Sequence, residues 1–223
     1  MSKLKLPKVT LITLSSIKIE ETINSLKYSM KGIDFGEVVF VTHKKINLDK
    51  DGIKVYNVPK INYEGFSKLA VYDLPKWVKT DYMIMVAWDS AIINPEQWTD
   101  EFLEYDWVGP LWTTQHEYYD KNGNQVRVGN GNSLRSQKLI RMASELNLPW
   151  KPFTNNGKHK PGYWEDSWIC VKNRHIYETH GCKFAPIELA ARWGHENHTP
   201  PIKENKGIKP FLFHGKDISL GGL

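Results

Sequence analysis

The chain has 223 residues, of which 40% are hydrophobic and 25% are charged, and its mean hydropathy is −0.49. This composition excludes a disordered chain and is typical of a globular protein with one sizeable core. The net charge of +5 favours anionic partners, but the basic residues are scattered and form no nucleic-acid-binding motif. We therefore expect no nucleic acid partner.

Three features that the sequence lacks bear on the cellular compartment of the protein. No stretch reaches the roughly 18 apolar residues that a membrane helix needs, so we expect no transmembrane segment. The apolar run 9–14 has no small-residue cleavage site after it, which favours a first strand over a signal peptide. The two cysteines, Cys170 and Cys182, form no disulfide framework and suit a reducing compartment. We therefore expect a cytoplasmic protein.

The first half of the chain alternates between strand and helix patterns. The patterns predict elements at 8–16 (strand), 17–30 (helix), 36–44 (strand), 52–59 (strand), 65–78 (helix) and 81–90 (strand). This order predicts an α/β fold with a mixed, mostly parallel sheet. Because the fourth strand is almost continuously apolar, we expect it at the centre of the sheet, covered on both faces.

The second half is less regular. It predicts elements at 95–105 (helix), 106–112 (strand), 126–136 (strand), 136–146 (helix, with Ser136 as its N-cap), 147–164 (loop) and 165–181 (helix), followed mostly by loop. The absence of repeats and linkers predicts a single domain over 1–223. We expect residues 1–90 to form a nucleotide-binding half, and residues 91–223 to form a half that binds the acceptor and completes a metal site.

Polar residues end several of the predicted strands. Ser15, Thr42 and Asp89 come at carboxyl ends, and ligands of open α/β sheets bind at that edge. Asp89 and Ser90 have a simple alternative interpretation as turn residues. However, a carboxylate held after a long buried strand is well placed to bind a hard cation such as Mn²⁺ or Mg²⁺.

An apolar strand that ends in an acid resembles the GT-A glycosyltransferases, in which a "DxD" motif holds a metal on the nucleotide-sugar diphosphate. Five runs resemble, more specifically, a poorly characterised bacterial and viral glycosyltransferase-like family. They are WDSAIINPEQWTDEFLEYDWVGPLW (88–112), VGNGNSLRS (128–136), EDSWIC (165–170), KFAPIELAARW (183–193) and PFLFHG (210–215). That family more often has Asp-Gly where this chain has Asp89-Ser90, and GNGGFSLRS where this chain has residues 129–136.

The resemblance implies a GT-A-like, Rossmann-like fold and assigns roles to residues near the C-terminus. GT-A enzymes commonly bring a C-terminal His to the metal, so His214 would join Asp89 as a metal ligand, and Lys216 would contact the diphosphate. An Asp/His site suits Mn²⁺ slightly better than Mg²⁺. His195 and Glu196 precede His198 in GHENH, which lacks the His-Glu-x-x-His spacing. We interpret this segment as structural, or as supporting the metal ligands.

The motif EDSW resembles the acid pair that carries the base in some inverting GT-A enzymes. Asp166 is then the favoured general base, with Glu165 orienting the acceptor, although either acid could be the base. Acids in a first helical turn also favour the helix dipole, so capping is the alternative interpretation.

The remaining candidate contacts divide between donor and acceptor. Expected donor contacts are Thr13, Ser15, Lys68, Asp89, Ser90 and Lys216. The expected sugar or acceptor cleft comprises Trp112, Asn130, Gly131, Asn132 and Trp164. Core packing is the alternative interpretation for Trp112, and an exposed surface position is the alternative for Lys68.

Taken together, the sequence predicts a metal-dependent glycosyltransferase. It would move a hexose-like sugar from a nucleoside-diphosphate donor, with UDP slightly favoured, to a hydroxyl of a glycan or polysaccharide, with inversion of configuration. The alternatives are a metal-dependent phosphoester hydrolase, which needs a denser Asp/His cluster, and a non-catalytic nucleotide- or carbohydrate-binding protein on a transferase fold. A nucleic-acid binder is a third alternative, which only the net charge supports.

Overall fold

The computed structural model describes residues 3–154, 162–197 and 202–215. Within these ranges the strands are β1 (Leu4–Ser15), β2 (Ile33–Thr42), β3 (Lys54–Asn57), β4 (Tyr82–Met85), β5 (Ser90–Ile92), β6 (Trp107–Val108), β7 (Leu134–Ser136), β8 (Gly194–Glu196) and β9 (Leu212–His214). The helices are α1 (Ile19–Ser29), α2 (Tyr63–Lys68), α3 (Leu74–Trp77), α4 (Gln137–Glu145), α5 (Glu165–Ser167), α6 (Arg174–Thr179) and α7 (Ile187–Trp193). None of the described helices has the length and apolarity to cross a membrane.

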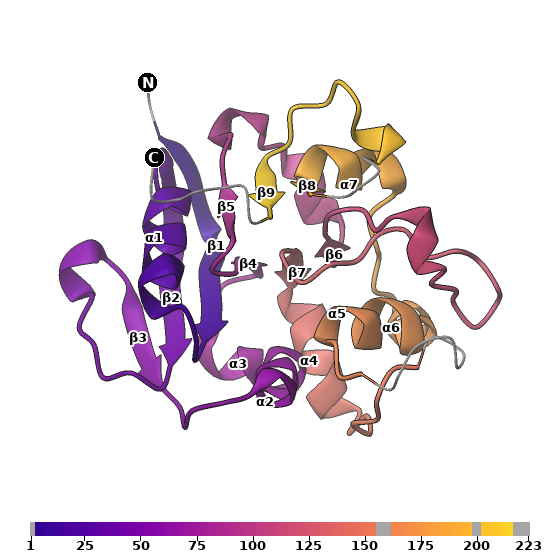
Figure 1. The fold of residues 1–223 in the computed structure, drawn as a ribbon, viewed down its shortest axis with the longest axis horizontal. Coiled ribbons are helices and arrows are strands. Elements are labelled where there is room, and N and C mark those ends of the chain that lie inside the picture. Colours follow the sequence, from indigo (N-terminus) through magenta and orange to yellow (C-terminus); the bar gives the residue numbers. More distant parts are fainter. Residues whose placement is uncertain (1–2, 155–161, 198–201, 216–223) are drawn as a thin grey trace.

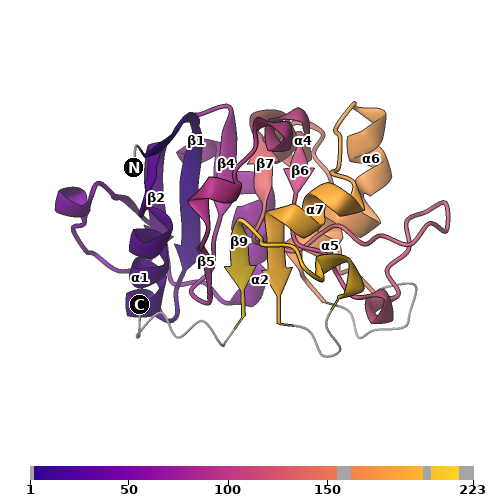
Figure 2. The same cartoon turned by 90° about the horizontal axis from the view of Figure 1, so that it is seen from above.

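Two sheets organise the described part of the chain. The main sheet has the strand order β3-β2-β1-β4-β7-β6, and the small sheet has the order β5-β9-β8. Strands β1 to β4 pair in parallel, while β7 runs antiparallel to β4 and β6. Helix α1 lies at one side of the molecule, and α5 and α6 lie at the other (Figures 1 and 2). The predicted α/β fold with a mixed, mostly parallel sheet is confirmed.

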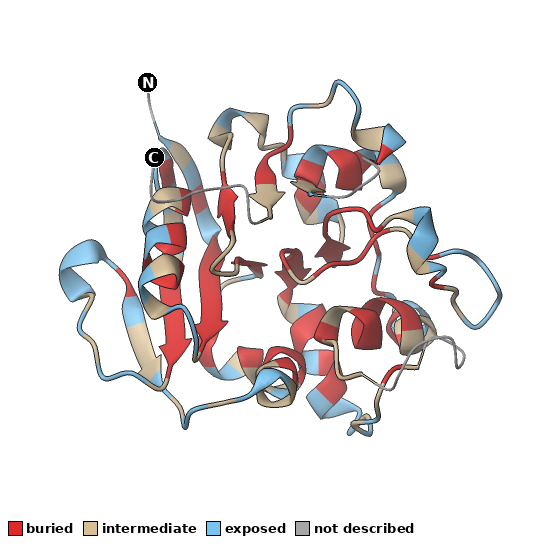
Figure 3. Cartoon of the chain, viewed as in Figure 1, coloured by how far each residue is buried: buried red, intermediate tan, exposed pale blue. Residues whose placement is uncertain are grey.

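The core follows from the apolar strands of the first half. Leu11 and Ile12 of β1 and Val39 and Phe40 of β2 are fully buried, because helices and loops cover both faces of the sheet. Buried residues follow β1 and β2 and the inner sides of the helices, and the outer loops are exposed (Figure 3). Strand β4 lies between β1 and β7, so its predicted central position is confirmed.

The fourth strand is shorter than the predicted strand over 81–90. Strand β4 ends at Met85, so Asp89 lies in the turn between β4 and β5 and not at a strand end. The cause is local, because the N–H of Ala87 donates to the side chains of Ser90 (2.7 Å) and Asn132 (3.0 Å) instead of to a neighbouring strand. Side-chain acceptors of this kind compete with strand pairing.

Other elements also differ from the prediction. The segment expected as a helix over 95–105 forms two 3₁₀ turns, Pro95–Gln97 and Asp100–Glu104. The predicted strand 126–136 is reduced to β7, and the helices expected over 65–78 and 165–181 each contain a wider π-helical turn, Leu69–Asp73 and Trp168–Lys172. Ser136 caps α4 as predicted, because its hydroxyl accepts from Leu139 N at 3.1 Å.

Candidate active site

A cavity of about 340 Å³ opens at the carboxyl ends of β1 and β4. Ser15 ends β1 and Met85 ends β4, and both line it. The wall residues lie in segments 14–17, 61–63, 85–89, 130–132 and 165–166, together with Phe66 and His214. The cavity therefore draws on the two halves of the chain, at the edge of the sheet where the sequence predicts a ligand site.

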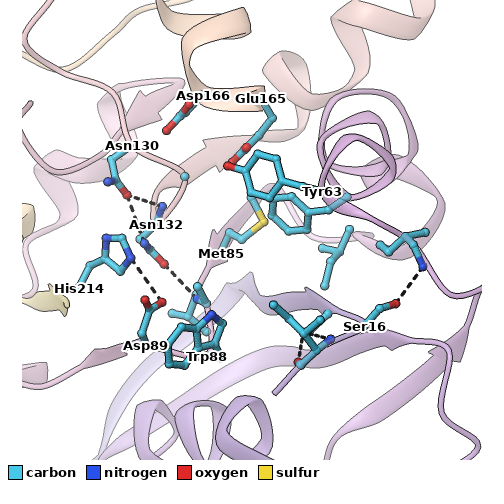
Figure 4. Close-up of a pocket in the computed structure, with 18 of the residues that line it drawn as sticks. Ser16, Tyr63, Met85, Trp88, Asp89, Asn130, Asn132, Glu165, Asp166 and His214 are labelled. Carbon is cyan, nitrogen blue, oxygen red and sulfur yellow. Dashed lines mark hydrogen bonds and ion pairs between the residues drawn. The ribbon is translucent and has the colours of Figure 1, made fainter. Parts of the chain in front are cut away.

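Asp89 and His214 come together on one wall of the cavity (Figure 4). Asp89 Oδ1 lies 3.4 Å from His214 Nε2, and the Asp89 carbonyl accepts from Gly215 N at 2.9 Å. Pairing between β5 and β9 produces this approach, because Ser90 lies opposite His214 in the small sheet. The fold thus brings together two residues that are 125 positions apart in the chain, His214 and Asp89.

Glu196 completes this group of charges. It contacts His214 Nδ1, and its carboxylate also accepts a hydrogen bond from the Asn130 amide. Burial disfavours the charged imidazole, but hydrogen bonds to Asp89 and Glu196 outweigh it and raise the pKa of His214 to about 10. The two carboxylates therefore favour the protonated form of the His214 imidazole.

The Asn130–Asn132 loop forms the neighbouring wall. Asn130 has a left-handed backbone (φ 64°), and its side-chain oxygen accepts from Asn132 N at 2.9 Å. Asn132 Oδ1 in turn accepts from the Ser90 hydroxyl at 2.6 Å and from Ala87 N. These bonds tie the loop to the turn that carries Asp89.

Glu165 and Asp166 occupy another part of the wall, at the start of α5 (Figure 4). Glu165 Oε1 lies 3.5 Å from the guanidinium of Arg135, and only 3% of Glu165 is exposed. Asp166 Oδ1 accepts from Ser167 N at 2.6 Å. Burial, together with the nearby charge of Glu165, raises the pKa of Asp166 to about 7, against the effect of the Ser167 bond. Asp166 can therefore hold or release a proton near neutral pH.

The aromatic part of the cavity is not among the residues predicted from the sequence. Trp88 and Tyr63 line it, with Lys18 Nζ 5.7 Å from the Trp88 ring centroid. Tyr63 is 59% exposed at the first turn of α2, where Asn62 caps the helix by accepting from Gly65 N at 2.9 Å. The sequence pattern Asn-x-x-Gly indicates the start of helix α2 at Asn62. It does not indicate that the Tyr63 ring faces a cavity, because the direction of an exposed ring cannot be read from the sequence.

Arg135 was also missed as a residue of the site. It is fully buried and lies next to the wall, bonded to the Gly131 carbonyl and paired with Glu165. The sequence signal was an arginine in the middle of an otherwise small and apolar strand pattern. Glu196, interpreted from sequence as structural or supporting, lies beside His214.

The structure brings eight of the predicted residues to the cavity. They are Ser15, Asp89, Asn130, Gly131, Asn132, Glu165, Asp166 and His214, of which His214 is the predicted second metal ligand. Their roles as donor, acceptor, catalytic and metal-binding residues stay predictions.

Five predicted residues do not line the cavity. Thr13 is buried in β1, and its hydroxyl has no hydrogen-bond partner among the described residues. Ser90 is also buried and does not line the cavity; its hydroxyl donates a hydrogen bond to Asn132, which does. Lys68 pairs with Glu64 at 3.0 Å on the outside of α2. Trp112 and Trp164 cover glycines elsewhere, because a Cβ on Gly129 or Gly162 would meet their rings at 2.0 and 2.2 Å. Lys216 lies outside the described residues.

The side chains of the cavity can supply only some of the ligands that a divalent cation needs. Among residues 3–154, 162–197 and 202–215, no group of three or more His, Cys, Asp or Glu side chains could hold a metal by itself. Asp89 and His214 supply one oxygen and one nitrogen, and a carboxylate behind a histidine ligand, as Glu196 is, commonly orients its ring. The pair suits a cation that takes its other ligands from water and substrate phosphates.

Comparison with solved structures shows the fold. A crystal structure of an active-site mutant of LgtC superposes with a TM-score of 0.54 at 11% identity, covering 93% of this chain and 87% of that one. Apo glycosyltransferase GlyE from Streptococcus pneumoniae TIGR4 gives 0.45 at 10% identity, covering 93% and 54%. S. aureus TarS gives 0.39 at 14% identity, covering 65% and 50%, so the chain spans about half the length of the GlyE and TarS structures.

The LgtC similarity confirms the predicted GT-A-type glycosyltransferase fold. No curated protein is matched by the sequence. A family described as "Protein of unknown function (DUF5672)" matches residues 64–214, which include every wall segment after β3 except Ile61 to Tyr63. On this match over more than half of its length, the chain belongs to the DUF5672 family.

Proposed function

We propose that the protein is a glycosyltransferase that moves a sugar from a nucleoside-diphosphate donor to a hydroxyl group of a glycan or polysaccharide. The observation that carries the proposal is one cavity with two distinct polar walls. Asp89 and His214 supply possible metal ligands on one wall, and Glu165 and Asp166 supply carboxylates on another. The cavity lies at the carboxyl end of a parallel sheet, where such folds bind nucleotides.

Asp89 and His214 would hold Mn²⁺ or Mg²⁺, with phosphate oxygens of the donor in the remaining positions. When bound, the cation would neutralise negative charge that develops on the departing diphosphate. Lys216, which lies outside the described residues, remains a proposed diphosphate contact. UDP remains the slightly favoured nucleotide and a hexose the favoured sugar.

Asp166 acts as the general base in this proposal. Its carboxylate takes the proton of the acceptor hydroxyl while the acceptor oxygen forms a bond to the anomeric carbon. The bond from that carbon to the diphosphate oxygen breaks, and its electron pair leaves with the nucleoside diphosphate. A single displacement of this kind inverts the configuration at the anomeric carbon, and Glu165 orients the acceptor.

The test is a thermal-unfolding screen of nucleoside diphosphates and nucleotide-sugars, each with and without Mn²⁺. A donor present at 100 times its Kd adds about 2.7 kcal/mol to the free energy of unfolding. For a chain of this size that is an increase in Tm of about 5–10 °C. The Asp89→Ala variant should lose the Mn²⁺-dependent part of this increase, and the exposed Asp34→Ala variant should keep it.

The outcomes separate the possible functions. If no donor raises Tm with or without Mn²⁺, the glycosyltransferase proposal is wrong. A donor that binds but is neither transferred nor hydrolysed would indicate a binding protein. Hydrolysis of a generic phosphomonoester without sugar transfer would indicate a phosphoester hydrolase.

A further inference from the structure

Arg135 in β7 is a fully buried cation directly behind the cavity wall. Its Nη2 donates to the Gly131 carbonyl at 3.2 Å and lies 3.5 Å from Glu165 Oε1, and its guanidinium carbon lies 4.3 Å from the Trp107 ring centroid. Taking a charge out of water is costly unless nearby groups compensate it. Arg135 is therefore held by contacts that converge on the wall of the site.

A second helix of the wall depends on the same guanidinium. Arg135 Nη1 donates to the Ala70 carbonyl at 3.2 Å. Ala70 belongs to the π-helical turn Leu69–Asp73, in which a carbonyl accepts from the residue five positions on. For Ala70 that residue is Pro75, which has no N–H. Arg135 thus takes the place of a missing backbone donor and links the α2–α3 segment to the cavity wall.

Gly131 also lies close to the Glu165 carboxylate. A Cβ atom on Gly131 would lie 2.5 Å from Glu165 Oε1. Gly131 is not among the described residues with positive φ, so its backbone accepts an L-residue and the glycine is needed for space. The Glu165 carboxylate oxygen is therefore packed closely against both the Arg135 guanidinium and the Gly131 backbone.

Among the described contacts, the ion pair of Arg135 is with Glu165, whereas Asp166 accepts from Ser167. The two adjacent carboxylates therefore have different partners. We propose that Arg135 is a positioning residue that acts through Glu165: it fixes that carboxylate against Gly131, so that Glu165 orients the acceptor and Asp166 takes its proton. This inference rests on the proposed glycosyltransferase function.

Several titratable groups face Asp166 and must be considered in any pH experiment. Glu165 and Cys170 lie on its own helical segment, Arg135 comes from β7, and Glu196 from β8. Tyr63 from α2 and Tyr118 from the loop after β6 also face it. Only Glu165 and Arg135 among them are altered in the variants below.

The first experiment measures the carboxylate pair without any substrate. Protein labelled with ¹³C at Asp and Glu carboxyl carbons is titrated by NMR, and the pair is assigned with Asp166→Asn and Glu165→Gln. Removing a buried positive charge should move the last deprotonation of the pair to higher pH in Arg135→Met, by about one pH unit or more. In Glu165→Gln the Asp166 titration should move to lower pH, because a negative neighbour is lost.

The second experiment measures transfer with a UDP-sugar that the wild type uses. In Arg135→Met, kcat should fall about 100-fold, as expected for a misplaced catalytic group, while the Kd for UDP with Mn²⁺ changes less than about twofold. In the Glu165→Gln background, Arg135→Met should cause little further loss, because the residue through which it acts is already altered. Arg127→Met is the matched control, since Arg127 pairs with Glu204 at 3.2 Å away from the cavity.

A further variant covers the case in which Arg135→Met fails to fold. Gly131→Ala keeps the Arg135 side chain and displaces the Glu165 carboxylate with the added methyl group, so it should give the same loss of kcat with unchanged UDP affinity. The inference is overturned if Arg135→Met titrates like the wild type, or if it lowers kcat by the same factor with Glu165→Gln as without it. Full kcat in Gly131→Ala would overturn it too. If the wild type transfers no sugar at all, the proposed function fails, and the NMR titration alone then decides whether Arg135 governs the pair.

Discussion

Glu165 and Asp166 are neighbours in sequence, yet their environments differ. Glu165 lies against a guanidinium, while Asp166 has a backbone N–H donor and the negative charge of Glu165 nearby. Two neighbouring carboxylates with unequal surroundings can have different roles in acid–base catalysis. This inequality supports Asp166 over Glu165 as the proposed base.

The Asp166→Asn variant tests that assignment. It should lower kcat by about 10²–10⁴-fold, the usual contribution of a general base, and leave donor binding unchanged. In the wild type, the rate should rise with pH and level off above about 7, where Asp166 becomes ionised. Transfer kinetics from pH 5 to 9 check both points, and undiminished turnover in Asp166→Asn would show that another group is the base.

The same residue should affect stability with a defined sign. The folded-state pKa of Asp166 is raised from 3.8 to about 7, so the ionised carboxylate destabilises the fold above pH 7. That cost disappears as the pH falls toward 4. Asp166→Asn should therefore be more stable than the wild type at pH 8, with a smaller difference at pH 5. Urea unfolding at both pH values measures this, with exposed Asp34→Asn as the control.

At the scale of elements, the contact between β1 and β2 depends on a glycine. Their register shifts between Leu6 and Thr10, and a Cβ on Gly36 would lie 2.2 Å from the Pro7 carbonyl oxygen. Gly36→Ala should lower the free energy of unfolding by about 1–3 kcal/mol, because one strand must move away from the other. Urea unfolding checks this. Asp34→Ala should change stability by less than about 0.5 kcal/mol, and an equally stable Gly36→Ala would contradict the close contact.

At the scale of the molecule, an aromatic cluster holds the small sheet in place. Phe211 is fully buried, with ring centroids 5.4 Å from Trp98, 6.2 Å from Phe102 and 5.2 Å from Trp193. It directly precedes β9, which carries His214. The cluster thus connects the core of the second half to one wall of the cavity.

Phe211→Ala should lower the free energy of unfolding by about 3–5 kcal/mol. Because β9 would lose its anchor, the variant should also lose the Mn²⁺-dependent rise in Tm caused by a donor. Calorimetry with and without donor measures both effects. The half-exposed Leu146→Ala should retain both, and a Phe211→Ala protein that keeps the Mn²⁺ effect would show that β9 is held by other contacts.

The elements that could be predicted from the sequence are those with long, regular patterns. In strands β1 and β2 and in helix α1, a regular pattern of apolar residues extends over ten or more positions. The small sheet could not be predicted, because each of its strands has three residues and β5 pairs with a strand about 120 residues later. Such short strands are determined by tertiary pairing and not by local pattern.

The candidate site was predictable to a similar degree. Acids and amides next to a strand or a helix start, such as Asp89, Asn130 and Asp166, do line one cavity. The aromatic candidates Trp112 and Trp164 lie outside that cavity, because a ring can pack on either side of its own backbone. Their direction is set by small neighbours, Gly129 and Gly162, that leave room for the ring.

The polar contacts around His214 form a closed circuit in which each side chain contacts the next, and the last is adjacent in sequence to the first. The circuit runs through Asp89, His214, Glu196, Asn130, Asn132 and Ser90. A circuit of this kind constrains the substitution history of a lineage, since replacing one member removes a polar contact from each member next to it. Across the family, these six positions should therefore change as correlated sets and seldom one at a time.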